Sequence, residues 1–270
     1  MERFEEFLAE RKYLKNVTDK TLVYYRCAFK SWERHSQGDW KTWIVNQRQA
    51  GISATSINTY ICAMNAHWKW AGTDLKVDYL KEEQKILATF KAEQVQRLLA
   101  FKPKGKNETR CHALVCLLLD TGLRIDESRK LEPANLDFEN LLITVMGKGR
   151  KERRGPISFE GRKILYRFVQ RHPGRFVFGT RNQTLCTVRN LQRDFAAICQ
   201  RIGIAGVRCS FHTLRHTFAV CYLRNGGNLF YLSKILGHSS VKTTERYLQS
   251  LGVEDLQAVH ERFSLLGRQR

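Results

Sequence analysis

Residues 212–216, in the second half of the chain, read HTLRH. This motif predicts a helix with a guanidinium and an imidazole on one face. Positions i and i+3 of a helix share a face, so the side chains of His212 and Arg215 point the same way. Three further stretches collect similar residues: TGLRIDES at 121–128, GKGRKERR at 147–154 and LGHSSVKTTERY at 236–247. Packing or a solvated turn explains each stretch taken singly, so only their combination indicates chemistry.

Together these stretches supply the groups needed around a phosphodiester that undergoes substitution. Arg124 and Arg215 can each bind nonbridging oxygens in a bidentate manner, and neither loses its charge. Histidines can donate to the same oxygens or move a proton near pH 7. Tyr247 lies nine residues after His238 and is a candidate nucleophile. Its hydroxyl, with a reference pKa of about 10, needs a cationic pocket to ionise at neutral pH.

Acidic residues are scarce in these four stretches. Asp126 and Glu127 are the only adjacent acids near the motifs. Metal-dependent nucleases need clustered carboxylates to hold Mg²⁺. The sequence therefore predicts no metal site and favours chemistry without a metal ion.

The charge of the chain indicates a polyanionic partner. The 270 residues include 46 Lys and Arg against 26 Asp and Glu, a formal net charge of +20. Residues 1–90 carry +3 of this excess and residues 91–270 carry +17. Such a surface gathers nucleic acid through counterion release. No apolar run approaches the roughly 20 residues that span a bilayer, so we expect no membrane partner and a cytoplasmic, nucleoid-associated protein.

Hydrophobic periodicity divides the chain into two parts. The first part, residues 1–80, reads as four helices, with Ile57, Ile61, Met64 and Trp68 on one stripe. The second part, residues 81–270, is helical except for a period-2 pattern near residues 135–158. We predict a mainly α fold with a small antiparallel β-sheet.

Two groups of polar or basic residues are candidate DNA contacts. Thr55 and Asn58 lie near the start of a predicted helix, where backbone N–H groups can meet a phosphate, although simple capping explains them equally well. Arg150, Lys151 and Arg153 belong to the basic stretch 147–154, where a solvated turn is the alternative.

On these motifs the chain resembles the tyrosine recombinases, also called the phage integrase family. TGLRIDE looks like the family's first-arginine motif, GKGRKER like its lysine β-hairpin, HTLRH like its His-x-x-Arg motif, and LGHSS with Tyr247 like its closing box. The resemblance is strong from about residue 92 to 264. It implies a helical core-binding domain, residues 1–80, and a mixed α/β catalytic domain, residues 81–270, without the additional arm-binding domain of some integrases.

The resemblance also implies a role for each matching residue. The catalytic group would comprise Arg124, Lys148, His212, Arg215, His238 and Tyr247, with Glu127 and His216 in support. The two arginines would hold the scissile phosphate, and the lysine would protonate the departing 5′-oxygen. His212 would act as base or donor toward Tyr247, the nucleophile, and His238 would hydrogen-bond a nonbridging oxygen. The intermediate would be a 3′-phosphotyrosyl bond, with no metal, ATP or other cofactor.

The function so implied is site-specific recombination of double-stranded DNA, for integration or excision of a mobile element. Leu256, Val259, Phe263 and Leu266 form an apolar stripe after the last site residue. In the family such a terminal helix docks on a neighbouring subunit, so we expect a homotetramer on two DNA sites. Three alternatives stay open at this point: a topoisomerase that forms a 3′-phosphotyrosine, a non-catalytic DNA-binding relative, and an RNA-binding domain.

Overall fold

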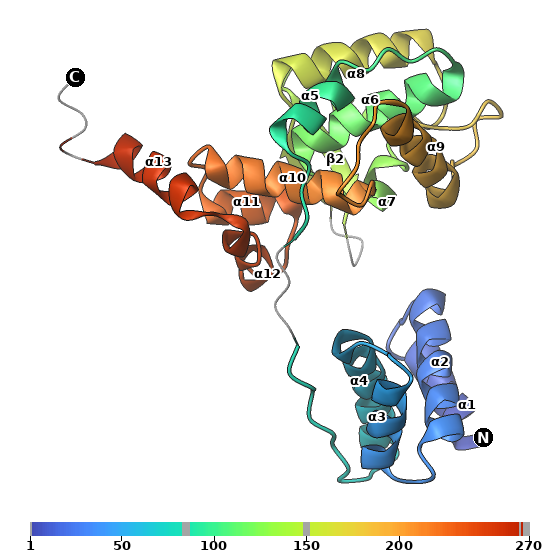
Figure 1. Cartoon of the computed structure of the whole chain (residues 1–270). Coiled ribbons are helices and arrows are strands. Elements are labelled where there is room, and N and C mark those ends of the chain that lie inside the picture. The colour runs from blue at the N-terminus through green and yellow to red at the C-terminus, as the bar shows by residue number, and fades with distance from the viewer. Residues whose placement is uncertain (1, 83–86, 148–151, 265, 267–270) are drawn as a thin grey trace. The chain divides into compact units, whose positions relative to one another are not determined.

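The chain forms two compact units in a computed structural model that describes residues 2–82, 87–147, 152–264 and 266 (Figure 1). The smaller unit is Met1–Lys85 and the larger unit is Ile86–Arg270. Both are mainly helical, and one small antiparallel sheet lies in the larger unit. The predicted fold class is therefore confirmed. None of the described helices is long and apolar enough to cross a membrane.

Four helices build the smaller unit. They are α1 (Glu2–Tyr13), α2 (Asp19–His35), α3 (Trp40–Gln49) and α4 (Ala54–Trp70). The side chains of Thr18, Asp39 and Ser53 cap α2, α3 and α4 by accepting from the backbone N–H three residues later. Each such cap contributes about 1 kcal/mol. The predicted apolar stripe of α4 is buried against Trp43 in the core of this unit.

Two asparagines of α4 fasten the chain that leaves this unit. Asn65 donates from Nδ2 to the carbonyl of Val77 and accepts from its N–H, at 2.8 and 2.9 Å. Asn58 makes the same pair of bonds with Leu80, at 2.8 and 2.7 Å. Each side-chain amide takes the place of a backbone partner, so the N–H and C=O groups of Val77 and Leu80 are satisfied although this segment packs against a helix.

Helices, three short strands and 3₁₀ turns build the larger unit. In chain order they are α5 (Ala92–Leu99), α6 (Lys106–Thr121), α7 (Ile125–Ser128), η1 (Pro133–Asn135), β1 (Leu136–Asp137), β2 (Leu142–Met146), β3 (Glu152–Pro156), α8 (Phe159–Arg171), α9 (Val188–Arg201), α10 (Phe211–Arg224), α11 (Leu229–Leu236), α12 (Lys242–Glu245), η3 (Leu248–Ser250) and α13 (Val253–Phe263).

Helix α6 is the centre of the larger unit. Eight of its sixteen residues are buried, and α5, α8, α9 and α10 all pack on it. It ends at Gly122, whose φ of +62° is left-handed and suits glycine. A Cβ on Gly122 would lie 2.3 Å from the ring of Phe218 on α10. A side chain is therefore excluded here, and the backbone after α6 comes close to α10.

The sheet has the strand order β1-β2-β3, and both pairs are antiparallel. Val145 pairs with Arg153, and Thr144 pairs with Arg154. Directly opposed residues of an antiparallel pair share a face of the sheet. Val145 is buried, so Arg153 points toward the core of the unit while Arg154 is exposed on the other face.

Candidate active site

The described candidate catalytic side chains come from four short segments of the larger unit. Arg124 is the N-cap of α7, directly after the end of α6. Arg215 lies in α10, and His238 follows the left-handed residue Gly237 that ends α11. Tyr247 lies in the turn between α12 and η3.

The guanidinium of Arg215 is the centre of this cluster. Its Nη1 donates to the carbonyl of Gly122 at 2.6 Å, and its Nη2 donates to the carbonyl of Leu236 at 2.8 Å. The same Nη2 lies 3.0 Å from Nε2 of His238. The residue is only 6% exposed, and burial, followed by the charge of Arg124, lowers its pKa to about 10. It therefore stays charged at neutral pH.

These contacts define the tautomer of His238. Arginine has no acceptor, so Nε2 of His238 accepts from Arg215 and the ring proton lies on Nδ1. Nδ1 in turn donates to Oγ1 of the buried Thr244 at 2.8 Å. Burial, followed by the charges of Arg215 and Arg124, lowers the pKa of His238 to about 4. The ring is therefore neutral at pH 7, with its lone pair directed at the arginine.

Tyr247 is buried between two imidazoles. It is 2% exposed, its ring centroid lies 6.4 Å from that of His238 with nearly parallel planes, and it lies 5.7 Å from that of His216. His216 is in turn 6.5 Å from His212. His216, expected from the sequence only to support the site, therefore lies between His212 and the tyrosine.

The other two histidines are also held in the neutral form. Burial, followed by the charge of Arg246, lowers the pKa of His216 to about 4. Burial and the charge of Arg215 lower the pKa of His212. The positive charge of the site thus resides on guanidinium groups, while the imidazoles beside them remain available to accept protons.

Glu127 orients Arg124 by accepting hydrogen bonds from both its side chain and its backbone. Its Oε1 accepts from Nη1 of Arg124 at 3.0 Å, and its Oε2 accepts from the backbone N–H of Arg124 at 2.9 Å. Oε2 also accepts from Nη2 of Arg153 at 2.8 Å. The carboxylate is buried, and two guanidiniums compensate its charge. The side chain of Arg124 remains 40% exposed, so it can still reach a ligand.

Arg153 links Glu127 to the carbonyl of Ile235 in α11 from inside the larger unit. Besides Glu127, it donates from Nη1 to the carbonyl of Ile235 at 2.5 Å. A Cβ on Gly237 would lie 2.4 Å from its Nε, so only glycine admits this arginine. Burial lowers its pKa. Both terminal nitrogens of Arg153 are engaged inside the protein, and its contact with DNA stays a prediction.

The two candidate DNA contacts of the smaller unit have partners within that unit. Asn58 is 7% exposed and binds Leu80 as described, and its Nδ2 also donates to Oε1 of Glu82 at 2.7 Å. Oγ1 of the exposed Thr55 donates to Oε2 of Glu82 at 2.7 Å. Asn58 therefore fastens the segment that follows α4, and its role as a phosphate contact stays a prediction.

Three predicted residues lie outside the described part of the chain. These are Lys148, the candidate general acid, and the neighbouring Arg150 and Lys151. The strands on either side are described, and Met146 pairs with Glu152 at the base of the hairpin. The hairpin therefore begins next to Arg153, which is tied to Glu127.

Sequence reasoning missed two contributors to the site. Thr244 fixes the proton of His238, yet it stands beside Thr243 without any distinguishing pattern. The inward direction of Arg153 depends on its pairing with the buried Val145 across the sheet, and the sequence does not reveal that register. No group of three or more His, Cys, Asp or Glu side chains among the described residues could hold a metal ion.

This arrangement can bind a phosphodiester and stabilise added charge on it. Nη2 of Arg124 donates to the carbonyl of Gly237, directly before His238, at 3.4 Å. Arg215 lies beside His238 and close enough to Tyr247 for their charges to interact. Preorganised guanidiniums stabilise the negative charge that develops on phosphate oxygens during substitution. A tyrosine beside neutral imidazoles has a proton acceptor at hand.

Comparison with known proteins finds a matching family and related sequences. Residues 88–252 match the family described as the phage integrase family, which is more than half of the chain. Tyrosine recombinase XerA of Pyrococcus furiosus is 30% identical over 232 residues, covering 83% of this chain and 79% of that protein. Tyrosine recombinase XerC of Escherichia coli O157:H7 is 26% identical over 288 residues, covering 97% and 94%.

A solved structure shares the fold. The Tn1549 transposon integrase in complex with a circular intermediate DNA superposes with a TM-score of 0.77 at 21% identity, covering 96% of this chain and 98% of that one.

Protonation of the buried histidines should make stability depend on pH. In the unfolded chain the imidazoles of His216 and His238 take up protons near pH 6.5, whereas in the folded chain they do so near pH 4. The unfolded state binds more protons between these values, so the free energy of unfolding should fall as the pH decreases from about 6.5 to about 4. Urea unfolding across this range should show a flatter profile for the double variant His216→Gln/His238→Gln. The exposed His260→Gln should leave the profile unchanged.

Loss of Arg153 should leave a buried carboxylate without half of its compensation. We expect Arg153→Gln to lower the free energy of unfolding by about 3 kcal/mol, because the buried Glu127 then keeps only Arg124 as an ion-pair partner. Arg154→Gln, on the exposed face of the same strand, is the matched control and should change it by less than about 0.5 kcal/mol. In a double-mutant cycle, Glu127→Gln should offset part of the Arg153→Gln loss. Additive losses would show that the pair is not coupled.

Proposed function

The chain belongs to the phage integrase family of tyrosine recombinases, and we propose that Tyr247 is the nucleophile with which it cuts DNA. As a member of this family it is a site-specific recombinase, an enzyme that cleaves and rejoins DNA strands. The observation that carries the proposal for Tyr247 is its burial against His216 and His238, beside the guanidinium of Arg215. Tyr231, by contrast, is 63% exposed on α11.

In the proposed reaction the hydroxyl oxygen of Tyr247 forms a bond to phosphorus, and the bond from phosphorus to the 5′-oxygen breaks. The product is a 3′-phosphotyrosyl linkage and a free 5′-hydroxyl. Arg124 and Arg215 bind the nonbridging oxygens, so they stabilise the pentacoordinate transition state. Lys148 gives a proton to the departing oxygen. The 5′-hydroxyl of a partner strand then attacks the linkage and restores the tyrosine, which preserves the phosphodiester without ATP.

The histidines divide the remaining proton and positioning work. His216, adjacent to the tyrosine ring, and His212, one ring further, accept or relay the proton of Tyr247. When Arg215 turns from Nε2 of His238 to the phosphate, the ring proton of His238 shifts from Nδ1 to Nε2. Nε2 then donates to a nonbridging oxygen, while Nδ1 accepts from Oγ1 of Thr244. Because Tyr247 is 2% exposed, the turn between α12 and η3 must open for the attack.

We propose integration and excision of a mobile element as the biological reaction, in the cytoplasm at the nucleoid. The structural likeness to the integrase of the Tn1549 transposon supports this direction. DNA from the borders of the gene's own locus is therefore the substrate to test first. Resolution of chromosome dimers is the rival reaction, and a plasmid carrying two copies of the mapped site distinguishes excision from joining of separate molecules.

We also propose that the recombinase works as a tetramer on two DNA sites through α13. None of the residues of α13 is buried, and Val253, Leu256 and Phe263 are each more than half exposed. The helix is held to its own chain by polar contacts: Arg224 pairs with Asp255 at 3.1 Å and Arg262 donates to Asn225. An apolar stripe of this kind, left open, fits docking on a second copy.

The same unit carries a candidate acceptor surface. Two adjoining hollows of about 260 and 440 Å³ share Leu119, Asp120, Phe218 and Cys221 in their walls, and we call the pair the α6–α10 groove. We propose that this groove receives α13 of the neighbouring subunit. Repetition of one such head-to-tail contact closes a ring when its rotation allows.

The nucleophile is tested by trapping the covalent intermediate. Wild-type protein with EDTA and border DNA should give an SDS-resistant protein–DNA adduct, and Tyr247→Phe should give none because it lacks the attacking oxygen. Tyr231→Phe, a tyrosine on a neighbouring helix, is the matched control and should keep the adduct. An adduct from Tyr247→Phe would exclude this residue as the nucleophile. Absence of an adduct from every protein on DNA that gel shift shows to be bound would favour a non-catalytic DNA-binding protein.

The role of α13 is tested by removing residues 254–270. The shortened protein should still bind a single site in gel shift, because the removed helix contributes no buried residue. It should not form the complex of two sites, which migrates more slowly in the gel, and it should therefore not exchange strands. Full recombination by the shortened protein would disprove docking through α13.

A further inference from the structure

Glu82 is bound by two side-chain donors at the start of α4. Its Oε2 accepts from Oγ1 of Thr55, and its Oε1 accepts from Nδ2 of Asn58, both at 2.7 Å. Thr55 and Asn58 are the residues of this unit that the sequence predicts as DNA contacts. They hold instead a carboxylate of the protein's own chain. We call Oγ1 of Thr55 and Nδ2 of Asn58 together the α4 anion site.

The bonds to Glu82 use donors that the rest of the fold does not need. A side-chain amide offers two N–H donors and one carbonyl acceptor. Asn58 uses its acceptor for the N–H of Leu80 and one donor for the carbonyl of Leu80. These two bonds fasten the segment after α4 without Glu82. The α4 anion site can therefore exchange one anion for another while the segment stays in place.

The carboxylate in this site is exposed and ionised. The hydrogen bond from Asn58, followed by the bond from Thr55, holds the pKa of Glu82 below its usual value. The group is therefore charged at neutral pH, and its side chain lies at the surface. A phosphodiester offers the same chemistry, because its two nonbridging oxygens carry the charge and accept hydrogen bonds as carboxylate oxygens do. The donors suit either anion.

A cation is fixed beside the start of α4. Arg48 is exposed, and its Nη1 donates to the carbonyl of Ile52 at 3.0 Å. Ile52 directly precedes Ser53, the N-cap of α4. The unpaired N–H groups and the macrodipole of a helix add positive potential at its start. The electrostatic potential around Thr55 therefore favours an anion.

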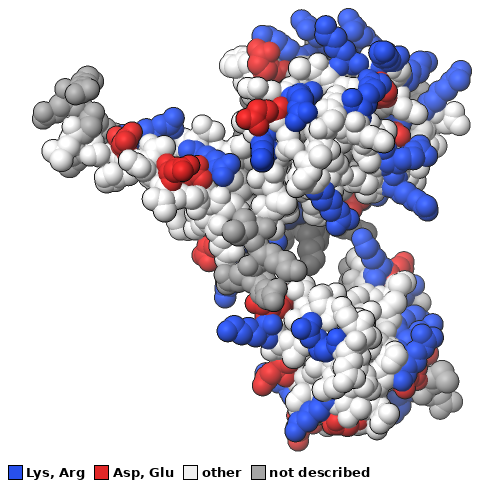
Figure 2. Space-filling model, viewed as in Figure 1, with Lys and Arg blue, Asp and Glu red and all other residues white. Residues whose placement is uncertain are grey.

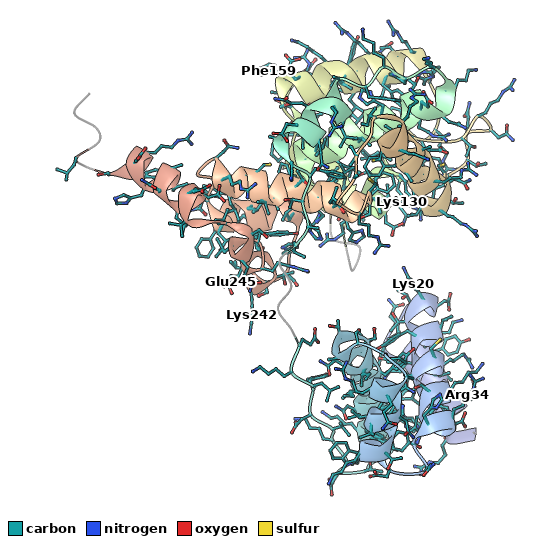
Figure 3. The ribbon with its side chains drawn as sticks, in the orientation of Figure 1. Lys20, Arg34, Lys130, Phe159, Lys242 and Glu245 are labelled. Atoms are coloured by element: carbon teal, nitrogen blue, oxygen red, sulfur yellow. The ribbon has the colours of Figure 1, made fainter. Side chains whose placement is uncertain are left out.

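The start of α2 brings a second cation to this end of the smaller unit. The rings of Tyr24 and Tyr60 lie 6.1 Å apart nearer the starts of α2 and α4. Those of Trp32 and Trp68 lie 5.0 Å apart near the ends, so the two helices run in the same direction. Lys20, exposed at the start of α2 and labelled in Figure 3, therefore lies at the end of the unit where α4 begins. Two cations thus attract DNA to the end that carries the α4 anion site.

The net charge of the smaller unit alone gives it little attraction for DNA. Residues 1–90 carry only +3 of the formal charge of +20. Figure 2 shows Asp and Glu interspersed with Lys and Arg over the visible face of this unit. Exposed charges act over about 10 Å at 0.1 M salt. The effect of a single acid on DNA binding therefore depends on where it lies, and Glu82 lies on the donors themselves.

We propose that Glu82 is an internal competitor for DNA: its carboxylate occupies a site for a backbone phosphate, and duplex DNA displaces it on binding. This inference rests on the proposed function as a DNA recombinase. The competitor belongs to the same chain, so it is present at a high effective concentration. A phosphate displaces it only when the duplex is held by further contacts at the same time. Glu82 thereby prevents the smaller unit from holding DNA through this site alone.

A purely structural tie between Glu82 and α4 is the alternative. The two explanations differ in sign. A competitor lowers the affinity for DNA, so its removal strengthens binding. A tie holds the segment after α4 in place, so its removal weakens binding or leaves it unchanged.

The test compares Glu82→Gln with Asp78→Asn on a duplex that carries the core site. Each variant removes one exposed negative charge from the segment after α4, and of the two acids Glu82 is the one bound at the α4 anion site. Measured by gel shift, Glu82→Gln should bind about tenfold more tightly, because the charged competitor and its hydrogen bonds are lost. Asp78→Asn should gain at most about twofold, and this gain should disappear at high salt, which screens exposed charges.

Thr55→Val shows whether the gain arises at this site. In the Glu82→Gln background it should weaken binding about fivefold, because the phosphate loses a hydrogen bond. In the wild-type background the loss should be smaller, because the same change also loosens the competitor. The matched control is Arg34→Gln on α2, which Figure 3 also labels. Arg34 follows Trp32 at the other end of the two helices, so it should change the affinity by the same factor in both backgrounds.

Unchanged or weaker binding by Glu82→Gln would overturn the proposal in favour of a structural tie. Equal gains for Glu82→Gln and Asp78→Asn would overturn it as well, because charge alone would explain them. An equal loss from Thr55→Val in both backgrounds would separate the gain from the α4 anion site and would also contradict the proposal. Binding needs no cleavage, and the adduct formed by Tyr247 on the same DNA is scored separately. Failure of the competitor is therefore distinguishable from failure of the recombinase chemistry.

Discussion

A buried permanent cation organises the larger unit. The guanidinium of Arg215 is almost wholly removed from water, and such a charge is tolerated only if its donors meet acceptors at good distances. The acceptors are two backbone carbonyls at helix ends, from Gly122 and Leu236, together with Nε2 of His238. The ends of α6 and α11 must therefore come to the same point of α10. The glycines next to these carbonyls allow that approach, and the catalytic side chains follow from it.

The larger unit's chemistry could be predicted from the sequence because it is carried by residue types that are rare in combination. Two arginines, histidines and a tyrosine in four motifs predict a phosphodiester site wherever the chain brings them together. The mainly helical fold with a small sheet follows from hydrophobic periodicity and was confirmed. The position of Tyr247 in a turn was not predicted, because an uninterrupted polar stretch gives no sign of where a short helix ends.

The direction in which a polar side chain points cannot be read from its residue type. Arg153 has the composition of a surface contact, yet its register opposite Val145 turns it inward, where it compensates Glu127. Asn58 stands near a helix start, as a phosphate ligand does, yet its amide binds the backbone of Leu80. In both cases a distant segment supplies the partner. Local sequence therefore cannot reveal the difference, whereas tertiary contacts decide it.

Gly237 shows how a position without any functional group can resemble a catalytic one. Its left-handed backbone and the nearness of Arg153 leave space for a hydrogen atom and nothing larger. Mutational tolerance at this position is therefore set by volume, and an alanine there displaces the arginine that supports Glu127. A survey that ranks positions by how completely substitution abolishes activity will place Gly237 beside Arg124 and His238. Intolerance to substitution thus marks the framework of a site as strongly as it marks the groups that react.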